Sequence, residues 1–434
     1  MSQRYVIVGI TAVAALFLYV DRVCISILAD PMKADLCLTD EQKEVVLGAF
    51  FFTYALFQVP VGALADRYGP RLVLSVSIAA WSLVTALTGL AGSFGALLTA
   101  RLLLGVTEAG AYPAAAGLVK QWARPEERGR FSSLVALGGR IGGAIAPKLT
   151  ATLAVALAGV GVFGLVAGPS GVNWRAVLVL YGLLGVAMAV LFWAVVRDRP
   201  PVASPAVPRA DPPPLPAATV SPSAPPPPLT FLRRLVLLSR SRGLWLFGTL
   251  QFCNNISWAF LVTLLPTFLK DADVEIGLRG NIQTAILTAG CVGMILGGLV
   301  TDSARRRFGP RWGRSLPIAS MMALGAGMCA VASTSPGLWV TVGVLALMSL
   351  CQDLGNPSVW AYAQDVGGRN VGAALGFGNM LGNLGAALSP RLLGEVQRAG
   401  GWAAAFALCA GVYVCAALCG LMLDASKPVD ADDA

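Results

Sequence analysis

Two side chains of opposite charge lie inside one long apolar run of the sequence, at Arg101 and Glu108. A spacing of seven residues is two helical turns, so both would project from one helix face about 10 Å apart along its axis. An ionisable group in a membrane-spanning helix is costly and normally lines a protein interior or a watery cavity. We therefore interpret the pair as part of a polar site. The alternative is a structural ion pair, although such pairs are weak evidence for stability.

A second arginine indicates that the site binds an anion. Arg22 lies in the first apolar run of the chain, and we expect it at about the same depth in the membrane as Arg101. A guanidinium is always charged and binds a carboxylate through a two-pronged fork, so two convergent arginines suit a carboxylate substrate. A local pair between Arg22 and Asp21 is the alternative, but neighbours in sequence point about 100° apart on a helix.

Glu108 is the candidate for proton coupling, because it lies near the expected midplane. Burial and a nearby arginine act in opposite directions on the ionisation of a carboxylate, which makes it switchable. Asp21 is the second candidate. The intramembrane charges also favour an anionic substrate over a cationic drug, since the three arginines Arg22, Arg101 and Arg140 outnumber these two acids.

Further substrate contacts are expected from polar and aromatic side chains on the apolar runs. Arg140 would favour a substrate with a second negative or strongly polar group. The alternative for the two tryptophans is a role in packing or at the membrane interface. The remaining candidates for contact with substrate hydroxyls are Tyr19, Tyr54, Gln58, Asn255, Trp258, Trp360, Asn379 and Asn383.

The elements that must hold these residues are predicted to be membrane-spanning helices. Of the 434 residues, 56% are hydrophobic and only 13% are charged. Twelve apolar runs reach about the 20 residues that a bilayer crossing requires. We predict an all-α integral membrane protein with twelve transmembrane helices in two six-helix bundles. The runs lie near residues 5–29, 45–65, 72–91, 96–119, 131–157, 175–196, 244–269, 282–301, 315–334, 338–363, 371–393 and 402–423.

The basic residues indicate how the helices are oriented. With both termini inside, most of the 32 Lys and Arg residues fall on the inner side, as the positive-inside rule requires. The net charge of +9 is then a sign of topology and of contact with the lipid bilayer, not of nucleic-acid binding. We expect a monomeric, multi-pass protein of the bacterial inner membrane with both termini in the cytoplasm.

Several other classes of protein are disfavoured. The first apolar run is too long for a cleaved signal peptide and is expected to remain as the first helix. The nine Cys show no disulfide or metal spacing and the chain has no His, so we predict no metal and no cofactor. A membrane enzyme or receptor would need a catalytic constellation or a sensory domain, and neither is visible.

The chain divides into two similar halves. An offset of 243 residues relates Gly129 to Gly372 and Pro147 to Pro390, with two further glycine matches between them. Between the halves lies a proline-rich stretch, which cannot be helical and is expected to be a cytoplasmic linker. Parallel six-helix repeats with a site at their interface are typical of alternating-access transporters. The predicted parts are 1–199, the linker 200–229, 230–425 and a cytoplasmic tail 426–434.

Several motifs resemble those of a known family. The stretch Gly62-Ala-Leu-Ala-Asp-Arg-Tyr-Gly-Pro-Arg71 is similar to the signature of the major facilitator superfamily. Within it, the chain resembles the anion:cation symporter family, which includes hexuronate, aldonate and sialate carriers. The motifs for this are Phe17-Leu-Tyr-Val-Asp-Arg22, the stretch from Tyr54 to Gly62 with Gln58 and Pro60, the run from Arg101 to Pro113, Cys253-Asn-Asn255 through Pro266, and Gly382-Asn-Leu-Gly385. The resemblance implies proton-coupled uptake of an organic anion.

The chain also departs from this family pattern. Cys24 occupies a position where family members often carry Asn, and Arg140 is unusual. The chain lacks the His, and its seventh run lacks the Arg, that some glutamate and sialate carriers use, which disfavours those substrates.

Asp66 needs a separate role, because it lies at the cytoplasmic end of a predicted helix. A carboxylate there can cap the positive N-terminus of a neighbouring helix. The family implies that this contact, with the helix that starts near Asn370, closes an inner gate. Arg67 and Arg71 are further gating candidates, or they only anchor the loop to anionic lipid.

The function that these residues predict is proton-coupled symport of an organic anion, such as a sugar acid or another carboxylate. An anion exchanger or efflux antiporter of the same superfamily is the alternative. Drug antiporters of the superfamily carry a Gly-Pro pair in the fifth helix, whereas this chain has Gly142-Gly-Ala-Ile-Ala-Pro147 there.

Overall fold

The computed structural model describes residues 3–161, 171–198, 231–335 and 337–429, and the described part is built of helices without strands. The predicted linker lies outside the described residues. A short 3-10 turn, Pro125–Glu127, and a π turn, Phe260–Leu264, accompany the α-helices. These are α1 (Gln3–Asp35), α2 (Asp40–Tyr68), α3 (Pro70–Thr88), α4 (Phe94–Glu108), α5 (Ala111–Trp122), α6 (Arg128–Ala156), α7 (Trp174–Val195), α8 (Phe231–Arg240), α9 (Arg242–Ala259), α10 (Leu265–Asp271), α11 (Ile276–Ser333), α12 (Leu338–Val366) and α13 (Val371–Met422).

By length and composition, nine of the described helical segments could each cross a membrane. Two of them, α11 with 58 residues and α13 with 52, are far longer than the roughly 20 residues of one crossing. Each is divided by a glycine with positive φ, Gly309 at 74° and Gly401 at 72°. Glycine tolerates this conformation because it has no Cβ. The predicted span at 131–157 corresponds to α6, which is rich in Gly and is not among the nine.

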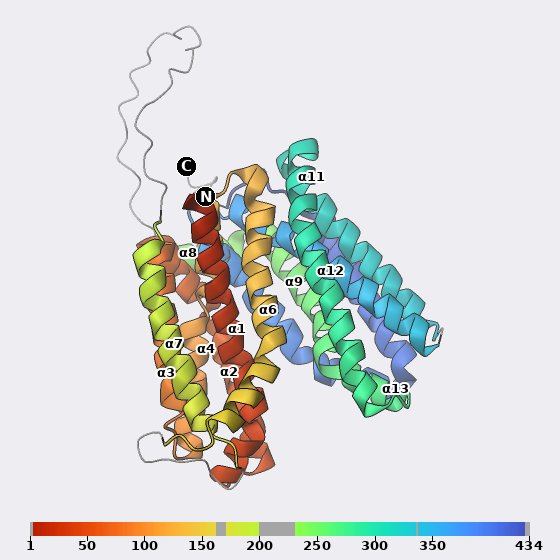
Figure 1. The fold of residues 1–434 in the computed structure, drawn as a ribbon. Helices are drawn as coiled ribbons and strands as arrows, with labels where there is room; N and C mark the ends of the chain where they lie inside the picture. The colour runs from red at the N-terminus through yellow and green to blue at the C-terminus, as the bar shows by residue number, and fades with distance from the viewer. Residues whose placement is uncertain (1–2, 162–170, 199–230, 336, 430–434) are drawn as a thin grey trace, which may run out of the picture.

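The helices form two groups (Figure 1). In one group α1 packs on α6, α3 on α7 and α2 on α4, and in the other α11 packs on α12 and α9 on α13. The groups meet where α2 contacts α13 and α6 contacts α11. The backbones approach each other closely at Gly62 and Gly372, where a Cβ on either residue would meet the carbonyl oxygen of the other. Small residues at such a crossing allow close helix packing.

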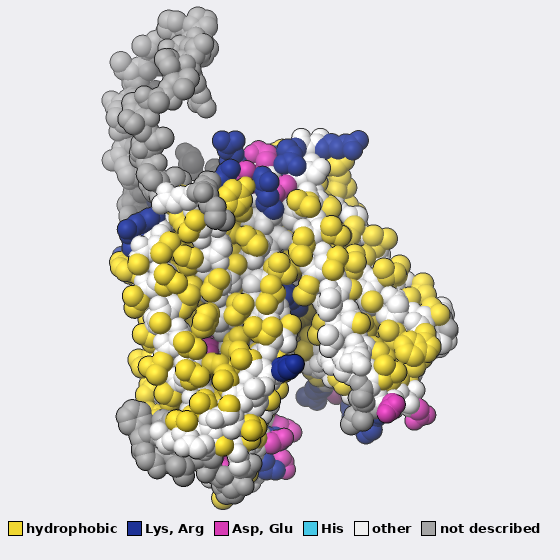
Figure 2. Space-filling view, viewed as in Figure 1, with side chains coloured by type: hydrophobic (Ala, Val, Ile, Leu, Met, Phe, Trp, Pro, Cys, Tyr) yellow, Lys and Arg dark blue, Asp and Glu magenta, His cyan; other side chains and the backbone are white. Residues whose placement is uncertain are grey.

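The two ends of the molecule differ. Both chain termini lie at one end, where Lys and Arg side chains gather (Figures 1 and 2). At the opposite end the two groups of helices diverge, and Figure 2 shows an open cleft between them. The molecule is therefore closed at the end with the termini and open at the other.

Candidate substrate site

The centre of the site is an ion pair between α1 and the last residue of α4. The carboxylate Oε2 of Glu108 accepts hydrogen bonds from Arg22 Nη2 at 2.8 Å and Arg22 Nε at 3.2 Å. The Glu108 side chain is 0% exposed, whereas that of Arg22 is partly exposed. The structure thus pairs Glu108 with Arg22 and not with Arg101, its neighbour on the same helix.

Arg101 is a buried cation beside this pair. It is only 2% exposed, and its Nε and Nη1 atoms find no hydrogen-bond partner among the described residues. The guanidinium carbons of Arg101 and Arg22 lie 4.9 Å and 5.0 Å from the centre of the Phe50 ring. Both predicted anion-binding arginines therefore contact the same aromatic side chain, and one of them has unused donors.

Aromatic rings line the Arg22 side of the site. The guanidinium carbon of Arg22 lies 4.3 Å from the ring centre of Tyr54 and 5.2 Å from that of Tyr19. Tyr54 stacks on Phe50 at 5.3 Å. Cation–π contacts of this kind hold a guanidinium in place without neutralising it. The sequence reasoning missed Phe50, although it precedes Tyr54 by one helical turn and so shares its face.

Asp21 forms no ion pair in the described structure. Both carboxylate oxygens are buried and have no hydrogen-bond partner among the described residues. Its surroundings include Trp81 of α3 and Tyr181 of α7. No ion pair between Asp21 and Arg22 occurs in the described structure, which agrees with the different directions that adjacent residues take on a helix.

A second ion pair lies between α6 and α12. Arg140 Nη2 is 2.5 Å from Asp353 Oδ1, and the Arg140 guanidinium carbon is 5.7 Å from the ring centre of Trp258. The sequence reasoning did not consider Asp353, although it is an isolated acid in an apolar run. The predicted surplus of intramembrane positive charge is therefore wrong. Asp353 is a third acid beside Asp21 and Glu108, so the number of acids equals the number of arginines.

The remaining candidates lie on α2, α9, α12 and α13. Both polar side-chain atoms of Gln58 are buried and have no partner among the described residues. Asn379 Oδ1 accepts from Gln251 at 3.4 Å, and Trp360 packs edge-on against Tyr112 at 5.0 Å. Asn255 and Asn383 donate to carbonyl oxygens one turn earlier in their own helices, each at 2.8 Å.

Two carboxylates close the end of the molecule that holds the termini. Asp66 of α2 accepts from the backbone amides of Gly372 and Ala373, at 2.7 and 2.9 Å, and so caps α13. Asp302 of α11 accepts from the amides of Gly129 and Arg130, at 2.8 and 3.3 Å, and so caps α6. A carboxylate at a helix N-terminus is favourable for the helix dipole. The two contacts are related by the repeat, and each joins the two groups of helices.

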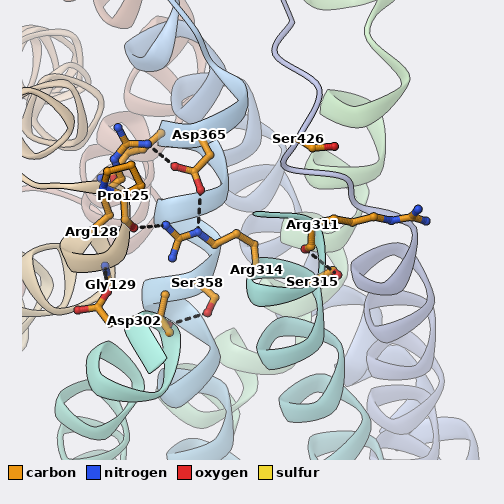
Figure 3. A network of polar contacts seen from close by, with 12 residues as sticks. Pro125, Arg128, Gly129, Asp302, Arg311, Arg314, Ser315, Ser358, Asp365 and Ser426 are labelled. Atoms are coloured by element: carbon orange, nitrogen blue, oxygen red, sulfur yellow. Dashed lines mark hydrogen bonds and ion pairs between the residues drawn. The ribbon is translucent and has the colours of Figure 1, made fainter. Parts of the chain in front are cut away.

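An ionic network reinforces the same end (Figure 3). Arg314 donates to Asp365 Oδ2 at 2.7 Å and to the carbonyl oxygen of Pro125 at 2.6 Å. Arg128 pairs with the other oxygen of Asp365. Because Pro125 and Arg128 belong to one group of helices and Arg314 and Asp365 to the other, the network ties the two together.

Arg67 and Arg71 contact their own helical group. Arg71 donates to the carbonyl oxygen of Trp193 at 2.7 Å, and its guanidinium carbon lies 3.9 Å from the Trp193 ring centre. The guanidinium carbon of Arg67 lies 5.2 Å from the ring centre of Tyr68.

The described residues hold no cluster of side chains suited to a metal ion.

Comparison with known proteins identifies related transporters. The sequence model of the Major Facilitator Superfamily matches residues 11–390. The probable sulfoacetate transporter SauU of Cupriavidus necator is 29% identical, over 100% of this chain and 96% of the relative. The hexuronate transporter of Bacillus subtilis is 28% identical, over 92% and 90%. The crystal structure of the E. coli fucose:proton symporter FucP has a TM-score of 0.72 at 17% identity, over 97% of this chain and 98% of that one, which shows a shared fold.

Proposed function

Because the chain belongs to the Major Facilitator Superfamily, a family of transporters and not of enzymes, we propose that it imports an organic anion by proton-coupled symport. The names of the relatives support the anion, since sulfoacetate and hexuronate are both organic acids. An anion exchanger remains the competing function within the family, and the experiment below separates the two.

The proposed topology has twelve spans. Splitting α11 and α13 at their glycines and adding α6 to the nine apolar segments supports this number. We propose bundles at 1–199 and 230–425, the linker 200–229 and the tail 426–434. We also propose a monomer in the bacterial inner membrane with both termini cytoplasmic, which would make the open cleft face outward and the capped end face inward.

One observation carries the proposal: Glu108 forms an ion pair with Arg22, while the neighbouring Arg101 has hydrogen-bond donors without a partner among the described residues. An incoming carboxylate would bind Arg101 and compete with Glu108 for Arg22. Protonation of Glu108 releases Arg22, so substrate and proton bind together. Desolvation of the cleft strengthens these interactions, because charges attract more strongly where water is excluded.

The two caps supply the gate of this mechanism. With Asp66 on α13 and Asp302 on α6 the inner end is closed, and substrate enters from outside. Breaking both caps would let the halves rock and open the inner end, as in alternating access. The other residues predicted from the sequence, including Tyr19, Tyr54, Gln58 and the three Asn, remain proposed contacts for the uncharged part of the substrate.

The test begins with a thermal-shift screen of organic acids, since a ligand of the folded state raises its melting temperature. The best anion is then used in proteoliposomes with Glu108→Gln, which mimics permanent protonation. For a substrate with a single acid group, this variant should show exchange in counterflow but no accumulation with an inward proton gradient. Its affinity for a substrate with a single acid group should not change with pH, whereas wild-type affinity should rise as pH falls and Glu108 is protonated.

Retained proton-driven accumulation by Glu108→Gln would contradict the role of Glu108 and shift it to Asp21. Loss of counterflow as well would make Glu108 a binding or structural residue. A wild-type protein that exchanges anions but does not respond to a proton gradient would identify an exchanger.

A further inference from the structure

The ion pair of Arg140 and Asp353 is not used by the mechanism proposed above. Arg140 projects from α6 and Asp353 from α12, so the pair joins the two groups of helices. Asp353 is buried, whereas Arg140 is partly exposed and lies against Trp258 of α9. An ionised pair placed between helical groups that must separate is costly unless it has a function.

Asp353 has one cation to balance its charge in the described structure. The other groups that act on it are Cys291 of α11 and Tyr413 of α13, which are neutral at ordinary pH. On the α11 side the helix approaches so closely that a Cβ at Gly290 would lie 2.5 Å from Asp353 Oδ2. If Arg140 binds another anion, no second cation of the described part compensates Asp353.

The two ion pairs are neighbours. Tyr19 lies 5.2 Å from the guanidinium carbon of Arg22 and also interacts with Arg140. Gly139 and Gly143, on either side of Arg140 in α6, pack against the Tyr19 ring, and a Cβ at Gly143 would lie 3.3 Å from it. Two arginine–carboxylate pairs therefore flank a single tyrosine.

We propose that Arg140 and Asp353 form a second acid-group subsite, and that the substrate is a small dianion such as a dicarboxylate or a sulfocarboxylate. The inference rests on the proposed transport function. One acid group of the substrate binds Arg22 and Arg101, and the other replaces Asp353 on Arg140. The uncharged sugar or alkyl segment between the two acid groups lies along Tyr19.

A proton accompanies the second acid group. One guanidinium cannot neutralise both Asp353 and an incoming anion, and an unpaired buried carboxylate is very costly. Asp353 therefore takes up a proton from the outer solution when the acid group displaces it. Binding of a dianion takes up one proton more than binding of the matching monoanion, and its affinity rises more steeply as pH falls.

The test uses two matched pairs of acids that differ by one acid group, gluconate with glucarate and acetate with sulfoacetate. Affinities of the purified full-length protein are measured by calorimetry at neutral and acidic pH. The wild-type protein should prefer the dianion by about tenfold or more, since a hydrogen bond to a charged group is worth roughly that factor. The preference should grow as pH falls.

Two variants separate the parts of the subsite. Asp353→Asn frees Arg140 permanently, so the dianion preference should become independent of pH. Arg140→Gln alone leaves Asp353 buried without a partner and risks misfolding. Combined with Asp353→Asn it leaves a neutral pair, and glucarate affinity should then fall at least tenfold more than gluconate affinity. The matched control is Arg391→Gln with Glu395→Gln, an exposed pair at 3.1 Å, which should leave the preference unchanged.

The outcomes distinguish the two proposals. The wild-type protein could bind both acids of a matched pair with equal affinity and lose this binding in Arg101→Lys. That result would overturn the subsite and leave the proposed function standing. A dianion preference that survives in the neutral Arg140/Asp353 double variant would also overturn the subsite. Binding of none of the four acids would overturn the subsite together with the carboxylate site of the proposed function.

Discussion

Replacing Arg101 by methionine is expected to separate substrate binding from stability. Arg101 is 2% exposed, and its Nε and Nη1 atoms have no partner among the described residues. The substitution therefore breaks no hydrogen bond through these two atoms, and the flexible methionine side chain can fill the apolar space beside Phe50. We expect the variant to fold but not to bind.

The two effects can be given magnitudes. A buried charge without a partner is costly, and even whole buried ion pairs can often be replaced by apolar side chains of similar volume with a change between zero and a stabilisation of about 1–4 kcal/mol. The melting temperature should thus stay the same or rise by a few degrees. Each hydrogen bond to a charged group contributes about 1.5–3 kcal/mol, so a lost two-pronged contact costs about 3–6 kcal/mol. The dissociation constant should increase at least roughly a hundredfold.

The assay is thermal unfolding of purified protein with and without the anion found by screening. Arg175→Met is the matched control, because Arg175 is also buried but donates to the carbonyl oxygens of Gly89 at 3.3 Å and Ala91 at 2.6 Å. The control should lower the melting temperature. Arg101→Lys should fold but bind weakly, because an ammonium loses the two-pronged geometry.

Two results would refute this reasoning. If folded Arg101→Met binds the anion with wild-type affinity, Arg101 does not contact the substrate. If Arg101→Met is destabilised as much as Arg175→Met, Arg101 contributes to stability and the view of it as a free donor is wrong.

Two further predictions concern the closed end of the molecule. Asp66→Asn should weaken the cap on α13 by about 0.3–2 kcal/mol and increase the inward-open population. With Asn255→Cys as a reporter, Asp66→Asn should lower the rate at which a reagent added from outside alkylates this cysteine, and an unchanged rate would contradict the prediction. Gly372→Val should destabilise the fold by about 1–3 kcal/mol through overpacking against α2, whereas Gly411→Val on the same helix, with no neighbouring atoms within 4 Å of its Cβ position, should not. Equal melting temperatures of the two glycine variants would rule out close packing at Gly372.

Much of the arrangement could be predicted from local sequence. Long apolar runs locate the helices, and the spacing of Arg101 and Glu108 places both on one face of a helix. The contact of Asp66 with the start of α13 also follows from the sequence, because the motif around Asp66 is specific and a helix N-terminus attracts a carboxylate.

The partners across helices could not be predicted in the same way. Asp353 lies 213 residues after Arg140, and which side chains meet depends on how each helix is rotated and how deeply it is inserted. Periodicity within one helix contains no such information. The same reason explains why Glu108 pairs with Arg22 of another helix, and why the contact of both arginines with Phe50 was missed.

The two helix caps have a consequence for how the closed end holds together. Asp66 of the first half contacts the start of α13 in the second, and Asp302 of the second contacts the start of α6 in the first. Such an exchange, in which each contact occurs twice, is the pattern of an isologous interface between identical subunits. The two halves of the single chain thus contact each other as the subunits of a two-fold dimer would if they were fused. Losing one cap leaves its symmetry mate intact, so the closed end is expected to weaken in two separate steps.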